Sequence, residues 1–106
     1  MPAYVISEVE VLDEQRADAY RELAAASVAH HGGRYLARGR LPDAIEGSWP
    51  ASRRMVVVEF PSMADARRWY ASAEYARALE IRRDALDRRL LFVDGDASPD
   101  SAGGAL

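Results

Sequence analysis

The 106-residue sequence contains no cysteine and only two histidines. Without cysteine, disulfides, thiolate zinc sites and cysteine nucleophiles are excluded. The net charge of −3 gives no excess of positive charge of the kind that nucleic-acid-binding domains carry. No apolar run approaches the roughly 20 residues needed to cross a bilayer, and the first residues lack the pattern of a signal peptide. Together with an Ala/Arg-rich composition, these absences predict a bacterial, cytoplasmic protein that binds neither nucleic acid nor membranes.

Several catalytic and cofactor motifs are also missing. No glycine-rich phosphate loop follows a predicted strand, and neither H-E-x-x-H nor G-x-S-x-G occurs. We therefore expect no metal and no cofactor. The composition, 49% hydrophobic and 29% charged, is that of an ordinary globular domain.

The first half of the chain alternates strand, helix and strand patterns. Residues 3–11 alternate apolar and polar side chains, which predicts a half-buried strand. Asp13 is a suitable N-cap for a helix over residues 14–31, which the glycines at 32–33 end. Residues 34–40 then predict a second strand, with Arg38 on its outward side.

The second half repeats the order strand, helix, strand. Residues 53–60 contain the strongest strand pattern, and Ser62 with Asp65 forms a capping box for the helix that follows. We expect this helix to turn Ala66, Trp69 and Tyr70 inward. A second helical segment is predicted over residues 73–87, with Ala76, Leu79, Arg83 and Leu86 on one stripe. The last strand is predicted at residues 89–94.

The order βαββαβ predicts an α+β fold of the ferredoxin-like type, with both helices on one face of a four-stranded antiparallel sheet. The other face is apolar, and a second copy of the chain would cover it. We therefore predict a homodimer. Its candidate interface residues are Tyr4, Ile6, Leu36, Met55 and Val57. Residues 1–95 are predicted as one domain and residues 96–106, polar and glycine-rich, as a disordered tail.

Five motifs occur in the order MPAYVIxExxV, HGGRYLxRG, EGxWP, VVxEFPSxxxAxxWYxSxEY and RLxxVDG. With them the sequence resembles the DUF1330 family, of the dimeric α+β barrel superfamily, from Met1 to Gly95. The resemblance implies a ferredoxin-like protomer and a dimer, but no reaction, because the wider superfamily includes cofactor-free monooxygenases, isomerases, cyclases and haem-using enzymes. His31 departs from the family pattern, which more usually has an aromatic residue there.

Arg38 and Glu59 are the first candidate catalytic residues. Both are predicted on the sheet face away from the helices, where a buried charge is costly unless paired or used. Arg38 would hold a substrate oxygen anion, and Glu59 would act as a general acid or base. The alternative is a structural ion pair between the two residues or across the dimer.

His30 and His31 precede the glycines that end the first helix. Adjacent helical residues point about 100° apart, so a shared metal ion is disfavoured and a helix-terminal role is favoured. His31 is the better candidate for moving a proton in a pocket, because it occupies the aromatic position of the family pattern. If haem were bound, only these two histidines offer an axial ligand.

Aromatic side chains complete the predicted site. Tyr4, Trp49, Tyr70 and Tyr75 are predicted to line a substrate pocket, although core packing is an alternative for the helical ones. The sequence thus predicts a small cofactor-independent enzyme, an isomerase, cyclase or monooxygenase of secondary metabolism, that acts on an apolar or aromatic oxygen-bearing metabolite. The alternative is a non-catalytic homodimer that binds a small molecule or is structural.

Overall fold

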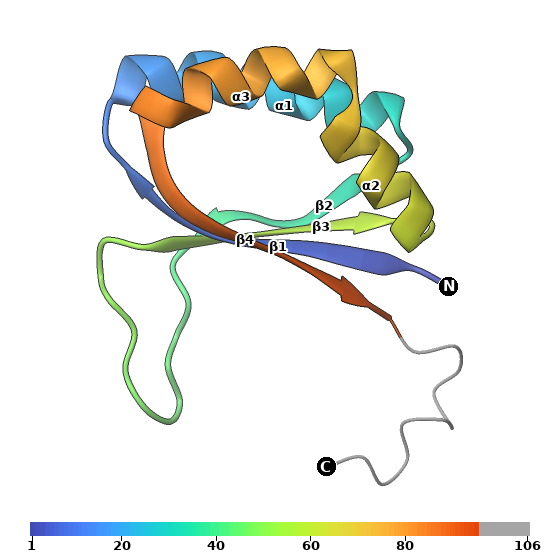
Figure 1. The fold of residues 1–106 in the computed structure, drawn as a ribbon. Coiled ribbons are helices and arrows are strands. Elements are labelled where there is room, and N and C mark those ends of the chain that lie inside the picture. The colour runs from blue at the N-terminus through green and yellow to red at the C-terminus, as the bar shows by residue number, and fades with distance from the viewer. Residues whose placement is uncertain (96–106) are drawn as a thin grey trace, which may run out of the picture.

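The computed structural model describes residues 1–95 and contains four strands and three helices (Figure 1). In chain order these are β1 (Ala3–Val11), α1 (Glu14–His30), β2 (Arg34–Arg40), β3 (Arg54–Phe60), α2 (Met63–Ala71), α3 (Ala73–Ala85) and β4 (Leu86–Asp94). The predicted disordered tail lies outside the described residues.

The strands form one sheet in the order β2-β3-β1-β4, with every neighbouring pair antiparallel. All three helices lie on the same side of this sheet, with α1 and α3 side by side above it and α2 closer to one end (Figure 1). This arrangement confirms the predicted ferredoxin-like α+β fold. We call the sheet face under the helices the inner face and the opposite one the outer face.

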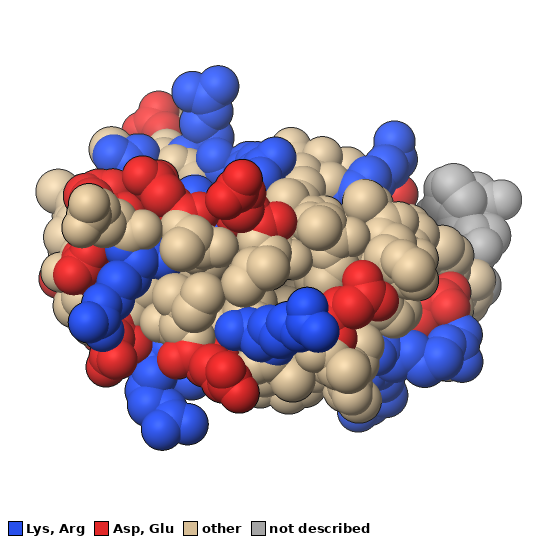
Figure 2. All heavy atoms as spheres, turned by 90° about the horizontal axis from the view of Figure 1, so that it is seen from above, with Lys and Arg blue, Asp and Glu red and all other residues tan. Residues whose placement is uncertain are grey.

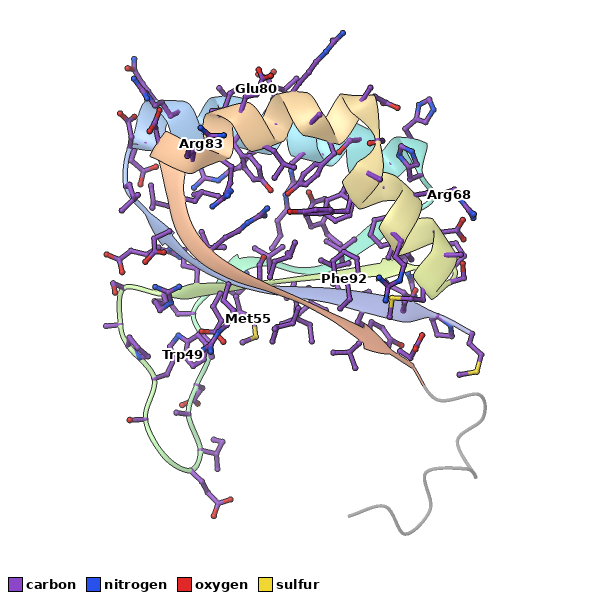
Figure 3. All side chains as sticks on the ribbon, in the orientation of Figure 1. Trp49, Met55, Arg68, Glu80, Arg83 and Phe92 are labelled. Carbon is purple, nitrogen blue, oxygen red and sulfur yellow. The ribbon has the colours of Figure 1, made fainter. Side chains whose placement is uncertain are left out.

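The core lies between the inner face and the helices. Alternation in β1 places Val5 and Val9 inward, at 3% and 9% exposure, as period-2 patterning predicts. Trp69 of α2 stacks on Tyr75 of α3 with ring centroids 4.1 Å apart. Phe92 of β4 lies between the sheet and α2, within 6.5 Å of the Trp69 ring (Figure 3). These aromatic rings hold α2 against the sheet.

Helix caps follow the sequence prediction. The side chain of Asp13 accepts a hydrogen bond from the Arg16 backbone N–H at 3.0 Å, and Ser62 accepts one from Asp65 at 3.1 Å. Ser72 caps α3 in the same way. Gly32 adopts φ +81° just after α1, a conformation in which a side chain would be strained. The caps therefore fix where each helix begins and where α1 ends.

The third helix and the last strand differ from prediction. No loop separates them. Helix α3 ends at Ala85, two residues before its predicted end, and β4 begins at Leu86. The buried stripe of α3 is Tyr75, Ala78 and Ala85, so the predicted stripe through Ala76 and Arg83 was wrong. The sequence here has no glycine or proline to mark the boundary, and the helix register could not be fixed from its periodicity.

The edge strand β2 is irregular. Its pairing with β3 shifts by one residue between Tyr35 and Ala37 and again between Arg38 and Arg40. Each extra residue reverses the face on which the following side chains lie. Gly39, one of the extra residues, has φ +74°. As a result Arg38 pairs with Val56 on the inner face, not on the outer face as predicted.

The surface above the helices carries acidic and basic side chains of both signs, with neither gathered into a single patch (Figure 2). Among residues 1–95, no helix has the length and apolar character needed to span a membrane.

Candidate functional site

A cavity of about 290 Å³ lies between the inner face of the sheet and the helices. Its walls are mainly aliphatic and come from all four strands, α1 and Trp69 of α2. The aliphatic lining consists of Val5, Val9, Val11, Ala24, Val28, Val56, Val58, Leu86 and Leu90. A hollow of this kind, with apolar walls and few polar groups, is the usual form of a small-molecule site.

One wall of the cavity carries a tyrosine–arginine cluster made of Tyr20, Tyr75 and Arg88. The hydroxyls of Tyr20 and Tyr75 are hydrogen-bonded to each other at 2.6 Å. Nη1 of Arg88 donates a hydrogen bond to the Tyr20 hydroxyl, and Nη2 donates one to the Tyr75 hydroxyl, both at 2.7 Å. Tyr20 and Arg88 line the cavity, whereas Tyr75 is fully buried behind them. Three elements, α1, α3 and β4, therefore meet at this cluster.

Burial controls the ionisation of the cluster. It strongly raises the pKa of Tyr75, and the neighbouring Tyr20 hydroxyl adds to the effect. Burial alone would lower the pKa of Arg88, but the two tyrosines outweigh it and the pKa is raised. At neutral pH the cluster is thus a cation held by two neutral phenols.

Further arginines line the cavity at exposed positions. The guanidinium of Arg38 lies 4.3 Å from the centre of the Tyr35 ring, a cation–π contact. Burial raises the pKa of Tyr35, and Arg38 partly opposes this. Arg54 donates a hydrogen bond to the carbonyl oxygen of Gly39 at 3.0 Å. Arg21 also lines the cavity. The lining therefore contains four arginines, and among residues 1–95 it contains no Asp, Glu or His.

The structure does not bring Arg38 and Glu59 together. Arg38 is on the inner face, while Glu59 is on the outer face opposite Tyr4. Glu59 instead accepts a hydrogen bond from Nε of Arg34 at 2.7 Å. The predicted placement of both residues on the outer face was wrong, and so was the alternative of an ion pair between them within one chain, because the irregular pairing of β2 moves Arg38 to the other face.

A double-mutant cycle should show this separation. We expect Arg38→Met and Glu59→Gln to change the free energy of unfolding additively, within about 0.5 kcal/mol, because the residues share no partner. The matched cycle of Arg34→Met with Glu59→Gln should show coupling of about 0.2–1 kcal/mol, as expected for a partly exposed ion pair. Urea denaturation measures both. Coupling confined to the Arg38 cycle would contradict the placement.

The two histidines lie at the end of α1, outside the cavity lining. Nδ1 of His31 lies 2.9 Å from the carbonyl oxygen of Ser27, and since a carbonyl only accepts, this nitrogen carries the proton. His30 is exposed and lies 3.6 Å from Glu74. Among residues 1–95, no group of three or more His, Cys, Asp or Glu side chains could hold a metal ion.

The four predicted aromatic residues are spread over the molecule. Tyr75 belongs to the tyrosine–arginine cluster. Tyr70 is 42% exposed, so its predicted inward position was wrong. Tyr4 is on the outer face, between Glu59 and Val93. Trp49 lies on the same side of the sheet (Figure 3) and donates a hydrogen bond from Nε1 to the carbonyl oxygen of Arg53 at 2.7 Å.

Three residues of the cavity lining were not identified from the sequence pattern: Tyr35, Arg88 and Tyr20, whose hydroxyl is part of the polar wall. Arg88 was missed because the predicted helix ran to residue 87. Had the strand been started at Leu86, the alternation Leu86, Arg88, Leu90 would have placed an arginine in the middle of an otherwise apolar inner face. A charge in such a position is a signal of function.

This sheet and its one-sided helix layer define a ferredoxin-like α+β domain (Figure 1). The chain belongs to the family described as "Domain of unknown function (DUF1330)", whose model matches residues 2–96. No curated protein is significantly similar to it in sequence.

Solved structures share the fold at low sequence identity. RPA0582, a protein of unknown function from Rhodopseudomonas palustris, has a TM-score of 0.73 at 17% identity, over 92% of this chain and 84% of its own. SnoaB, a cofactor-independent oxygenase from Streptomyces nogalater, has a TM-score of 0.67 at 11% identity, over 92% and 96%. A dimeric protein of unknown function from Bacteroides fragilis has a TM-score of 0.61 at 13% identity, over 89% and 96%. At these identities the similarity establishes the fold alone.

Proposed function

We propose that this protein is a small cofactor-independent enzyme that acts on an apolar or aromatic, oxygen-bearing metabolite in the cavity between sheet and helices. Isomerisation, cyclisation and oxygenation are the candidate reaction types. The observation that carries the proposal is an apolar cavity of about 290 Å³ with one polar wall, formed by Arg88 and Tyr20. The proposal is supported by SnoaB, which has the same fold and is itself a cofactor-independent oxygenase.

The proposal assigns roles to the predicted residues according to where they lie. Arg38, on the cavity lining, is proposed to hold an oxygen anion of the substrate. Tyr75 is proposed to position Arg88 and Tyr20. Proton transfer by Glu59 or His31 would need a site outside this cavity and stays a prediction, as does substrate binding by Tyr4, Trp49 and Tyr70. The cytoplasmic location, bacterial origin and place in secondary metabolism also stay predictions.

Ligand binding in the cavity can be tested with a neutral aromatic amide, 2-naphthamide. Leu90→Trp would fill the cavity from the inner face, whereas Leu91→Trp makes the same change on the outer face of the same strand. We expect Leu90→Trp to weaken binding by about tenfold or more, since an overpacked site has no room for the ligand. Leu91→Trp should leave it unchanged. Isothermal titration calorimetry gives the dissociation constants, and equal effects of the two variants would contradict the proposal.

A non-catalytic binding protein is the second candidate. It is favoured by the absence of any Asp, Glu or His from the cavity lining in the described part of the chain, because these are the usual general bases. Binding of many aromatic compounds without turnover of any of them would support this alternative.

The outer face supports a homodimer. Leu36, Leu91 and Val93 on it are 45–48% exposed, and the sheet presents Ile6 and Val57 between them. Figure 3 shows Met55 pointing to this side, away from the helices. An exposed apolar patch of this kind, at the centre of the outer face, is stabilised by a second copy. The Bacteroides fragilis relative is itself dimeric.

We therefore expect Val57→Glu to convert the dimer into a monomer, since it places a charge in the middle of the outer face. Ala76→Glu, which adds the same charge on the exposed side of α3, should leave the dimer intact. Sedimentation velocity at micromolar concentration distinguishes the two species. A monomeric wild-type protein would contradict the proposed dimer.

A further inference from the structure

We propose that the cavity binds a carboxylate-bearing apolar molecule and holds its carboxylate against Arg88 and the hydroxyl of Tyr20. This inference rests on the proposed function of the cavity as a ligand site and names the chemical class of the ligand. Three observations carry it: the unbalanced charge of Arg88, the proton count of the tyrosine–arginine cluster, and the arginines on the cavity lining.

Arg88 is a partly buried cation without an anionic partner. Its guanidinium is bonded to two neutral phenols, and in the described part of the chain it forms no ion pair with a carboxylate. On the strand it faces Val9 of β1, in an apolar environment. Burying an uncompensated charge is costly, and natural proteins keep such a charge when it is used. An anion arriving in the cavity would supply the missing partner.

The cluster has more hydrogen-bond donors than it uses. Arg88 has five N–H donors, of which the Tyr20 and Tyr75 oxygens take two. The remaining donors can bind both oxygens of a carboxylate through two parallel hydrogen bonds in one plane, the geometry that arginine favours. A neutral carbonyl would accept some of these hydrogen bonds but would not balance the charge.

The two tyrosine hydroxyls also leave one proton unused. The hydrogen bond between Tyr20 and Tyr75 uses one of their two O–H groups, and Arg88 only donates to them. Tyr75 is fully buried, whereas Tyr20 lines the cavity. Because a buried donor without an acceptor is costly, the favoured arrangement has Tyr75 donating to Tyr20 and Tyr20 donating into the cavity. An acceptor such as a carboxylate oxygen completes this chain.

The exposed arginines of the cavity lining favour the same ligand. Arg38 stacks on Tyr35, and Arg54 bonds only a backbone carbonyl, so neither forms an ion pair with a carboxylate within residues 1–95. With no acidic residue on the lining, these charges give the cavity a positive potential. Such a potential raises the association rate of an anion and disfavours a cation.

The test compares 2-naphthoate with 2-naphthamide at pH 7, because the two differ mainly in charge. We expect the wild-type protein to bind the acid more tightly, by about 10- to 100-fold, the effect of a charge-assisted hydrogen-bonded pair. Arg88→Met should reduce this preference to near unity, because it removes the charge that favours the acid, and it should weaken the binding of 2-naphthamide by less than about tenfold, the loss of a neutral hydrogen bond. Tyr20→Phe should weaken the acid by about tenfold and the amide by less, because a hydrogen bond to a charged acceptor is the stronger one.

Arg83→Met is the matched control, because Arg83 is exposed on α3 and does not line the cavity. It should retain the full preference for the acid. Retained binding of the amide shows that the Arg88 variant is folded, and Arg88→Gln provides a second variant if Arg88→Met is not. Equal binding of acid and amide by the wild-type protein, or an acid preference that survives Arg88→Met, would overturn the proposal and leave the proposed function standing. Binding of neither compound would contradict both.

Discussion

Replacement of Trp69 by alanine is expected to lower the free energy of unfolding by about 3–5 kcal/mol, the cost of deleting a large core aromatic side chain. Trp69 is 3% exposed and stacks between Tyr75 and Phe60, with ring centroids 4.1 and 5.3 Å away. Its Nε1 also donates a hydrogen bond to Ser27 Oγ at 3.0 Å. A loss of this size is a large part of the total stability of a single domain, which is about 5–15 kcal/mol.

Trp49→Ala is the matched control for this prediction. Trp49 lies in the segment between β2 and β3, where its Nε1 donates a hydrogen bond to the carbonyl oxygen of Arg53. Its replacement is expected to cost about 1 kcal/mol. Urea denaturation compares the two variants. Both are measured at the same protein concentration, because the contribution of a dimer to stability depends on concentration. A smaller loss at Trp69 than at Trp49 would contradict the assignment of the core.

The second large effect is a loss of stability in alkaline solution. Burial raises the pKa of Tyr75 far above its ordinary value of about 10. In the unfolded chain this tyrosine therefore ionises at a pH where the folded protein still keeps its proton. Above about pH 10 the unfolded state binds fewer protons, so the free energy of unfolding falls as pH rises, by up to about 1.4 kcal/mol per pH unit for this one group.

Tyr75→Phe removes this group and should make the decline above about pH 10 less steep. At pH 7 the same variant should be less stable by about 1–3 kcal/mol, because Arg88 and Tyr20 each lose a hydrogen-bond partner. Tyr70→Phe, at a position 42% exposed, is the control and should keep the wild-type slope. Urea denaturation between pH 7 and about pH 11 measures all three proteins. An unchanged slope in Tyr75→Phe would argue against a buried, protonated Tyr75.

Much of the fold could be predicted from local chemistry. The alternation in residues 3–11, the caps at Asp13 and Ser62, and the glycines after α1 each indicate one conformation only, and the structure contains all of them. Each signal comes from residues a few positions apart, so it needs no knowledge of the tertiary structure.

The candidate site was harder to predict because it depends on register. One irregularity in β2, the shift in pairing between Tyr35 and Ala37, is enough to turn Arg38 from the outer to the inner face. The direct passage from α3 to β4 at Leu86 brings Arg88 into the cavity, and no glycine or proline marks that boundary. The tyrosine–arginine cluster joins residues 55 and 68 positions apart in sequence, so no local pattern could show that they meet.

The most direct test of the account is to locate a bound ligand by NMR, using 2-naphthoate and protein with labelled methyl groups. Adjacent residues of one strand lie on opposite faces, so the methyl contacts identify the face that is occupied. We predict intermolecular nuclear Overhauser effects from the naphthalene ring to Val9, Val56 and Leu90, which line the cavity. Effects to Ile6, Val57 and Leu91 instead would place the ligand on the outer face and contradict the assignment of the cavity as the site.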